Sequence, residues 1–127
     1  MASAMRTAEC AVPYRERNFM AAPAITADPV LVRFRSALDA LYGDRLERVV
    51  LYGSRARGDA REDSDYDVAV FLHDMHDLGA ELHRLARLET ALIEGTGEIV
   101  HAMPHRAGSY DARTPLMREI RREGIAL

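Results

Sequence analysis

The chain contains little cysteine and no long hydrophobic run. Cys10 is the only cysteine among 127 residues, so no disulfide can form within the chain and a reducing compartment is expected. No apolar run approaches the roughly 18 residues that a membrane span needs. The first twenty residues also lack the apolar block of a secretory signal. These absences predict a cytoplasmic protein that is not associated with a membrane.

The chain also lacks a strong excess of either charge. It has 17 basic and 20 acidic side chains, which give a formal net charge of −3. A general nucleic-acid-binding protein usually carries a strongly basic face, so general binding of nucleic acids is not expected.

The length fits one domain. Residues 1–26 mix alanine, proline and charged residues without a period, which predicts a flexible N-terminal tail. Residues 27–127 are expected to form the domain. Met1 and Met20 both remain open as the start of translation.

Capping signals and apolar periodicity predict three helices, over 28–43, 77–94 and 114–124. Asp28 and Thr114 suit N-caps, and each is followed by a proline, which suits the first helical position. The residues expected to face the core are Leu31, Phe34, Leu38 and Leu41 in the first helix, Leu78, Leu82, Leu85, Leu88 and Leu92 in the second, and Leu116, Met117 and Ile120 in the third.

Three short runs rich in β-branched and apolar residues predict strands over 48–52, 65–72 and 98–103. Residues 54–61 are expected to form a tight turn or a short helix, and residues 104–113 a loop. The resulting order of elements predicts an α/β (α+β) fold. A small three- to four-stranded mixed sheet would carry helices packed mainly on one face.

Asp65 and Asp67 are the candidate metal ligands and catalytic residues. Side chains alternate along a strand, so both aspartates are expected on one face with Ala69 and Phe71, their Cα atoms about 6.5–7 Å apart. Two such carboxylates repel each other, whereas magnesium binds one or two carboxylates together with phosphates and water. The alternative is a pair of solvated aspartates at the start of a strand.

Gly53 and Ser54 are the candidate phosphate-binding turn, because they directly follow a predicted buried strand. Glycine adopts turn geometry that other residues avoid and lets a phosphate approach the backbone. Ser54 offers a hydroxyl, and backbone amides at the start of the next turn suit an anion. Arg55 and Arg57 are nearby cations for a triphosphate. The alternative for both arginines is a solvated turn.

The pattern Gly53-Ser54, ten intervening residues and Asp65-x-Asp67 resembles the signature of the DNA polymerase β-like nucleotidyltransferase superfamily. The short chain is similar to the minimal nucleotidyltransferases of that group. The resemblance covers residues 28–124 and is most specific around the motif. It implies the polymerase β-like nucleotidyltransferase fold.

Members of this superfamily transfer a nucleoside monophosphate to a hydroxyl and release pyrophosphate. The resemblance implies that Asp65 and Asp67 hold magnesium, and that Gly53, Ser54 and Arg57 bind the phosphates of ATP. Many minimal members are antitoxins encoded beside a HEPN-type toxin, and active ones attach AMP to a tyrosine of that toxin. A HEPN-type toxin is therefore the implied partner, and transfer of AMP to its hydroxyl is the implied reaction.

A complete superfamily site has a third carboxylate on a neighbouring strand, and the predicted strand 98–103 contains no aspartate. His101 aligns nearest to that position. Glu98 is the only carboxylate on the strand and would face the opposite side in a regular sheet. Two hypotheses stay open: an active enzyme, and a catalytically degenerate antitoxin or binding module that neutralises its partner by contact. An enzyme that modifies a small molecule is disfavoured, because 127 residues leave no room for an acceptor-binding domain.

Overall fold

The computed structural model describes residues 25–127. The predicted tail lies outside the described residues except for Ile25 and Thr26, and Cys10 lies outside them as well. Ile25 packs against the hydrophobic core. Within residues 25–127, no helix combines the length and apolar character needed to cross a bilayer.

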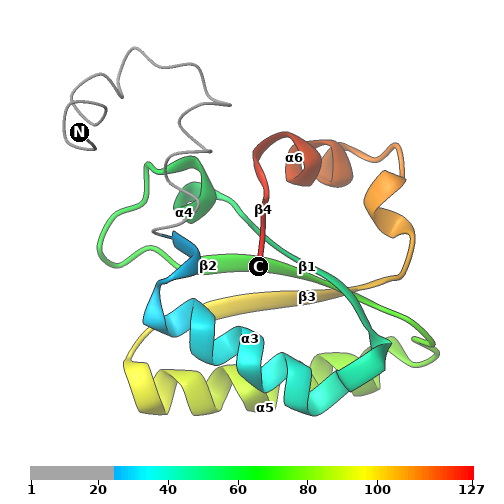
Figure 1. The fold of residues 1–127 in the computed structure, drawn as a ribbon, viewed down its shortest axis with the longest axis horizontal. Helices are drawn as coiled ribbons and strands as arrows, with labels where there is room; N and C mark the ends of the chain where they lie inside the picture. The colour runs from blue at the N-terminus through cyan, green and yellow to red at the C-terminus, as the bar shows by residue number, and fades with distance from the viewer. Residues whose placement is uncertain (1–24) are drawn as a thin grey trace.

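The domain contains four helices and four strands among the described residues, drawn in Figure 1. In chain order they are α3 (Pro29–Tyr42), β1 (Leu46–Tyr52), α4 (Ser54–Arg57), β2 (Tyr66–Leu72), α5 (Leu78–Thr96), β3 (Val100–Arg106), α6 (Pro115–Glu123) and β4 (Ile125–Ala126). Short 3-10 turns follow α3 at Gly43–Arg45 and precede α6 at Ser109–Asp111.

The four strands form one mixed sheet in the order β3-β2-β1-β4. Strand β1 is antiparallel to both β2 and β4, whereas β2 and β3 are parallel and are joined through α5. The predicted mixed sheet with helices mainly on one face is confirmed. The fourth strand has two residues, which is too short to produce a periodic sequence pattern.

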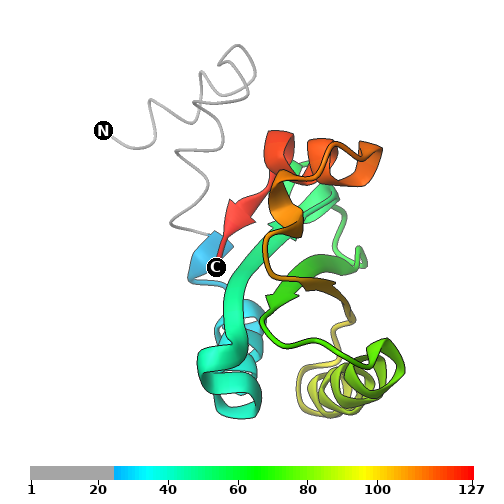
Figure 2. The same cartoon turned by 90° about the vertical axis from the view of Figure 1, so that its right-hand side faces the viewer.

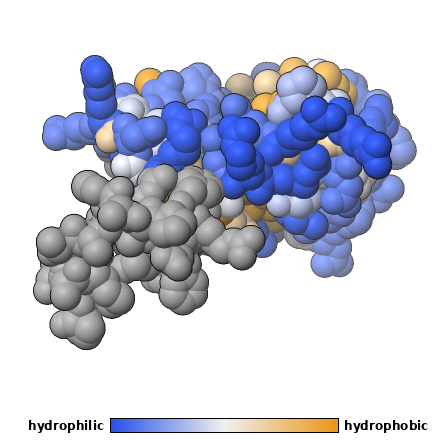
Figure 3. Space-filling model, turned by 90° about the horizontal axis from the view of Figure 1, so that it is seen from above, coloured by the Kyte–Doolittle hydropathy of each residue, from blue (hydrophilic) through white to orange (hydrophobic). Residues whose placement is uncertain are grey.

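Helices α3 and α5 lie on one face of the sheet and α6 lies on the other (Figures 1 and 2). The phase predicted for β2 is confirmed by its two sets of buried side chains. Tyr66, Val68, Val70 and Leu72 belong to the larger core cluster with residues of α3 and α5. Ala69 and Phe71 pack with Met117 and Ile120 of α6. The outer surface on the side of α4 and α6 is mainly hydrophilic (Figure 3).

The helix ends that depend on local capping were predicted well. Asp28 accepts a hydrogen bond from the Val30 amide at 2.8 Å, and Thr114 accepts one from the Met117 amide at 3.2 Å. The second helix was predicted too short, since α5 ends at Thr96 and is capped by Gly97, which has a φ of 77°, and not by the predicted glycine two residues earlier.

Several predicted core positions on the helices are wrong. Leu41 is exposed and its neighbour Tyr42 is buried instead, because α3 turns that position toward the sheet. On α5 the buried face runs through Glu81, Leu85 and Leu92. The remaining predicted core residues that are exposed are Leu78, Leu82 and Leu116.

The third strand differs from its prediction at both ends. Strand β3 spans Val100–Arg106, whereas the sequence predicted 98–103 followed by a loop. It runs through Pro104, which pairs with Val70 of β2. Strand β3 is at the edge of the sheet, and an edge strand tolerates a residue without an amide hydrogen. Proline therefore did not mark the end of this strand.

Candidate active site

Gly53 brings the end of β1 against the start of β2. It has φ 78° and ψ −161°, a conformation that L side chains rarely adopt. Tyr52 pairs with Asp67 across the two strands. A Cβ atom added to Gly53 would lie 2.5 Å from Oδ2 of Asp67. The predicted phosphate turn and the predicted acid pair therefore form one site.

His101 joins the two aspartates on the same face. It is opposite Asp67 in the parallel register of β2 and β3, and its Nε2 lies 2.9 Å from Oδ2 of Asp65. The imidazole is 63% exposed, so it is not a core histidine. Glu98 instead pairs with Arg55, with 3.8 Å between Oε1 and Nη2. Of the two residues considered for the third position, the structure thus places His101 beside the aspartates.

The Asp67 carboxyl is in a crowded electrostatic environment. Burial is the largest effect and raises its pKa above the ordinary value. His101 and Arg57 oppose that rise, while the charges of Asp65 and Glu123 add to it. A cation bound between the two aspartates would favour their ionised form.

Ser54 begins α4 directly after Gly53. The amides of Ala56 and Arg57 donate to the Gly53 carbonyl at 3.1 and 3.0 Å, which closes the turn. The Arg57 guanidinium lies 3.1 Å from Oδ2 of Asp59 and 3.3 Å from Oε1 of Glu123. Arg57 is 41% exposed, so it is a surface cation held next to the turn.

Arg55 has a different environment from the one predicted. Its guanidinium donates to the Ser64 carbonyl at 2.7 and 3.1 Å and to the Glu62 carbonyl at 3.2 Å. It also lies 4.3 Å from the centre of the Tyr66 ring. The prediction of Arg55 as a nearby cation for a triphosphate is therefore not supported. Arg55 holds the loop that leads into Asp65.

Glu123 is a residue of this site that the sequence analysis did not single out. It is 2% exposed, and its Oε1 accepts a hydrogen bond from the Gly53 amide at 2.8 Å. The contact joins residues 70 positions apart in the chain. No local signal distinguishes this glutamate from Glu119 on the same helix, so only the fold reveals it.

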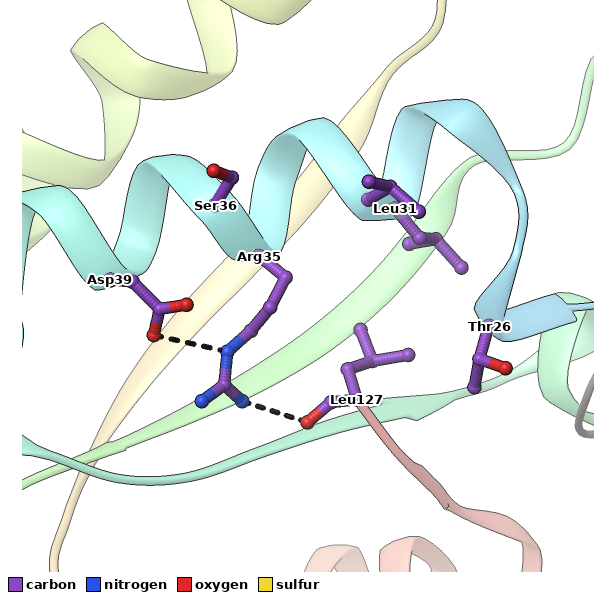
Figure 4. Close-up of a pocket in the computed structure, with 7 residues that line it drawn as sticks. Thr26, Leu31, Arg35, Ser36, Asp39 and Leu127 are labelled. Carbon is purple, nitrogen blue, oxygen red and sulfur yellow. Dashed lines mark hydrogen bonds and ion pairs between the residues drawn. The ribbon is translucent and has the colours of Figure 1, made fainter.

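One cavity adjoins the site. It has a volume of about 390 Å³ and is lined by Glu62–Asp65 on one side and Gly97–Ile99 on the other. A second pocket, of about 240 Å³, lies between α3 and the C-terminal Leu127 (Figure 4). Arg35 crosses it to donate to the Leu127 carbonyl at 2.7 Å. The first cavity is lined in part by Asp65 and Glu98, whereas none of the predicted site residues lines the second.

The side chains present fit a magnesium ion held in part by a substrate. No group of three or more His, Cys, Asp or Glu side chains within residues 25–127 is arranged to hold a metal. Asp65 and Asp67 supply two carboxylates on one face. Magnesium usually takes one or two carboxylates and completes its shell with phosphates and water. The missing side chain of Gly53 leaves the Asp67 carboxylate directly over the turn where phosphates are expected.

A family model described as "Nucleotidyltransferase domain" matches residues 31–122. The chain belongs to this nucleotidyltransferase family. The resemblance to nucleotidyltransferases drawn from the motif is thereby confirmed.

A curated relative from Methanocaldococcus jannaschii, named as a protein adenylyltransferase, is 39% identical over 46 residues. That segment covers 36% of this chain and 46% of the relative, less than half its length.

Solved structures share the fold. A nucleotidyltransferase structure from Sulfolobus solfataricus has a TM-score of 0.55 at 20% identity, and covers 76% of this chain and 75% of that one. A toxin–antitoxin structure with AMP-PNP has a TM-score of 0.52 at 19% identity, over 73% of this chain and 68% of that one. A structure of the toxin–antitoxin pair MntA–HpeT has a TM-score of 0.52 at 21% identity, over 72% and 68% of the two chains. The expected nucleotidyltransferase fold is confirmed.

Proposed function

We propose that this nucleotidyltransferase is magnesium-dependent and moves AMP from ATP to a hydroxyl on a partner protein, and that the partner is a HEPN-type toxin which the transfer silences. One observation carries the proposal: the Asp67 carboxylate lies against the Gly53 turn, and His101, which is opposite Asp67 in the sheet, contacts Asp65 beside it. A triphosphate at that turn and a cation at the two acids would contact each other.

In this proposal Asp65 and Asp67 hold magnesium, which when bound supplies positive charge against the triphosphate. Gly53 lets the β- and γ-phosphates approach the backbone, and the Ser54 hydroxyl donates to them. Arg57 adds a guanidinium at the edge of the turn. These residues orient the triphosphate, and orientation together with charge stabilisation accounts for most of the catalysis in phosphoryl and nucleotidyl transfer.

The chemical step is an in-line displacement. The acceptor oxygen forms a bond to the α-phosphorus of ATP, and the bond from that phosphorus to the bridging oxygen of the β-phosphate breaks. Pyrophosphate leaves, and the hydroxyl proton passes to a base. His101 is the candidate for that role in this chain, because it is opposite Asp67 on the neighbouring strand and contacts Asp65.

The proposals of a protein acceptor and of a toxin partner rest on similar proteins. The M. jannaschii relative is named for the adenylylation of protein, and two of the similar structures are toxin–antitoxin complexes, one of them with an ATP analogue. Asp65 is 40% exposed and Asp67 is half-buried, so a macromolecular acceptor can reach them. The cytoplasm, where ATP and magnesium are plentiful, is the compartment that this function requires.

Incubating the full chain with labelled ATP, magnesium and its HEPN-type partner tests the proposal. Label is expected on the partner, and Asp65→Ala or Asp67→Ala should remove it. Asp44→Ala, at an exposed position in the 3-10 turn after α3, is the matched control and should leave transfer unchanged. No transfer, combined with neutralisation of the partner by the two aspartate variants, would favour a module that acts by contact alone.

A further inference from the structure

Glu123 is a buried carboxylate whose hydrogen-bond partners, Gly53 and Arg57, lie at the proposed triphosphate site. Its Oε1 accepts from the Gly53 amide at 2.8 Å. The Nη1 atom of Arg57 lies 3.3 Å from Oε1 and 3.4 Å from Oε2. The Arg122 guanidinium is more distant, at 3.9 Å. One side chain from the end of α6 thus contacts both the backbone and the cation of the turn.

Glu123 is 2% exposed, and burial of a carboxylate is costly unless hydrogen-bond donors and cations replace the lost water. Here the compensation comes from Gly53 and Arg57. The dependence is mutual, since Arg57 has Glu123 on its buried side and Asp59, which is 61% exposed, on its solvent side. Without Glu123, the ion pair with the exposed Asp59 would draw the guanidinium toward solvent.

The backbone around Glu123 leaves it little freedom to move. A Cβ atom added to the next residue, Gly124, would lie 2.3 Å from the Ile120 carbonyl oxygen and 2.4 Å from Cγ1 of Val50. The end of α6 is therefore pressed against β1, and β4 continues directly from it to pair with β1. This packing fixes the carboxylate relative to the turn.

We propose that Glu123 is a positioning residue for the triphosphate: it holds the Gly53 amide and the Arg57 guanidinium in place and does not itself touch the nucleotide. The inference rests on the proposed function, because it assigns the phosphates to this turn. It predicts that Glu123 affects the binding of phosphates beyond the first. A nucleoside monophosphate, which does not reach the turn, should be insensitive to it.

The test measures the affinity of the full chain for a non-hydrolysable ATP analogue and for AMP, both with magnesium. Glu123→Gln keeps the size of the side chain and removes its charge. It should weaken analogue binding about tenfold, the loss of one charge-assisted hydrogen bond, with AMP binding unchanged. In an Arg57→Ala background the same change should cost much less. Glu81→Gln, which neutralises the other buried glutamate, is the matched control and should alter neither affinity.

Glu123→Asp provides a second variant if Glu123→Gln does not fold. Aspartate keeps the charge, but its side chain is one methylene shorter, so the carboxylate lies farther from Gly53 and Arg57. This variant should therefore also lower the ratio of analogue affinity to AMP affinity. An unchanged ratio, including equal weakening of both ligands, would overturn the inference and leave Glu123 with a structural role. If the unmodified chain binds no analogue, the proposed function fails and this role fails with it. If the unmodified chain binds the analogue and the Glu123 variants bind it equally well, only the proposed role of Glu123 is overturned.

Discussion

Glu81 and Glu123 are the two charged side chains that are buried among residues 25–127, and they lie at opposite ends of β1. Glu81 accepts from Arg45 at 2.6 Å and pairs with Arg84 at 3.0 Å. Arg45 also donates to the carbonyl of His73, so this end joins α5, the start of β1 and the loop after β2.

Glu123 is just as buried, yet its partners are a strained glycine and a surface arginine next to Asp67. The comparison teaches that burial of a charge does not by itself mark a functional site. Glu81 joins elements of the fold at the start of β1. Glu123 binds the turn after β1, which lies next to Asp65 and Asp67. Variants at the two ends should therefore separate stability from activity.

The largest effect on stability and transfer is expected from Gly53→Ala, and Gly43→Ala at the other end of β1 is the comparison. Both glycines have positive φ, but an added Cβ meets Asp67 only at Gly53 and nothing within 4 Å at Gly43. Gly43→Ala should cost about 1–2 kcal/mol of unfolding free energy through backbone strain and leave transfer unchanged. Gly53→Ala should cost more and lower transfer at least about a hundredfold, by the arithmetic of a barrier raised by about 3 kcal/mol.

Denaturant unfolding and the labelled-transfer assay measure both quantities on the same samples. If Gly43→Ala were to lower transfer as much as Gly53→Ala, the distinction between the two ends would be lost.

Glu81→Gln should act in the opposite way, on stability and not on transfer. Burial alone would raise the pKa of Glu81, but hydrogen bonds from Arg45 and Arg84 outweigh it and lower that pKa below its ordinary value. A lowered pKa in the folded state stabilises the fold above the unfolded pKa of about 4.3, and this stability is lost as the pH falls through the folded value. Glu81→Gln should therefore destabilise the chain by about 1–3 kcal/mol at pH 7, since the arginines are partly exposed.

Unfolding curves between pH 2 and pH 7 check this expectation. The difference between wild type and Glu81→Gln should shrink toward acid. A difference that grew as the pH fell would show that the charge of Glu81 does not stabilise the fold.

Arg55→Ala should have an intermediate effect at the active end. Arg55 holds the carbonyls of Glu62 and Ser64, so its loss should loosen the loop before Asp65 and lower transfer about tenfold through poorer positioning. Arg61→Ala, at an exposed position in the same loop, serves as the control. Similar transfer rates for the two variants would mean that the Arg55 contacts do not order the site.

The smallest effect is expected from Glu98→Gln. Glu98 is 38% exposed and its ion pair with Arg55 is long, at 3.8 Å. Exposed pairs of this kind contribute little, so transfer should change less than about twofold. A large loss in the transfer assay would make Glu98 the third carboxylate of the site and displace His101 from that position.

Local signals in the sequence predicted much of the fold and part of the local geometry around the candidate site. The capped helix starts at Asp28 and Thr114 and the shared face of Asp65 and Asp67 depend on neighbours within a few residues, so periodicity and capping rules apply to them. The Gly53 turn was also predictable, because it lies between a buried strand and a helix start.

The remaining features depend on contacts distant in the chain. Glu123 meets Gly53 only because α6 folds back over β1. Pro104 is accepted in β3 because that strand is at an edge, which strand order decides. The Arg55 guanidinium donates to the carbonyls of Glu62 and Ser64 in the following loop. None of these contacts leaves a local pattern.

The central claim is that the Gly53–Ser54 turn and the two aspartates hold one magnesium–triphosphate complex. Calorimetric titration of the full chain with a non-hydrolysable ATP analogue tests it directly, in magnesium, in EDTA, and with Asp65→Asn and Asp67→Asn combined. The account predicts binding that requires magnesium and is lost in the double variant. Equal affinity without magnesium, or with both aspartates replaced, would contradict it.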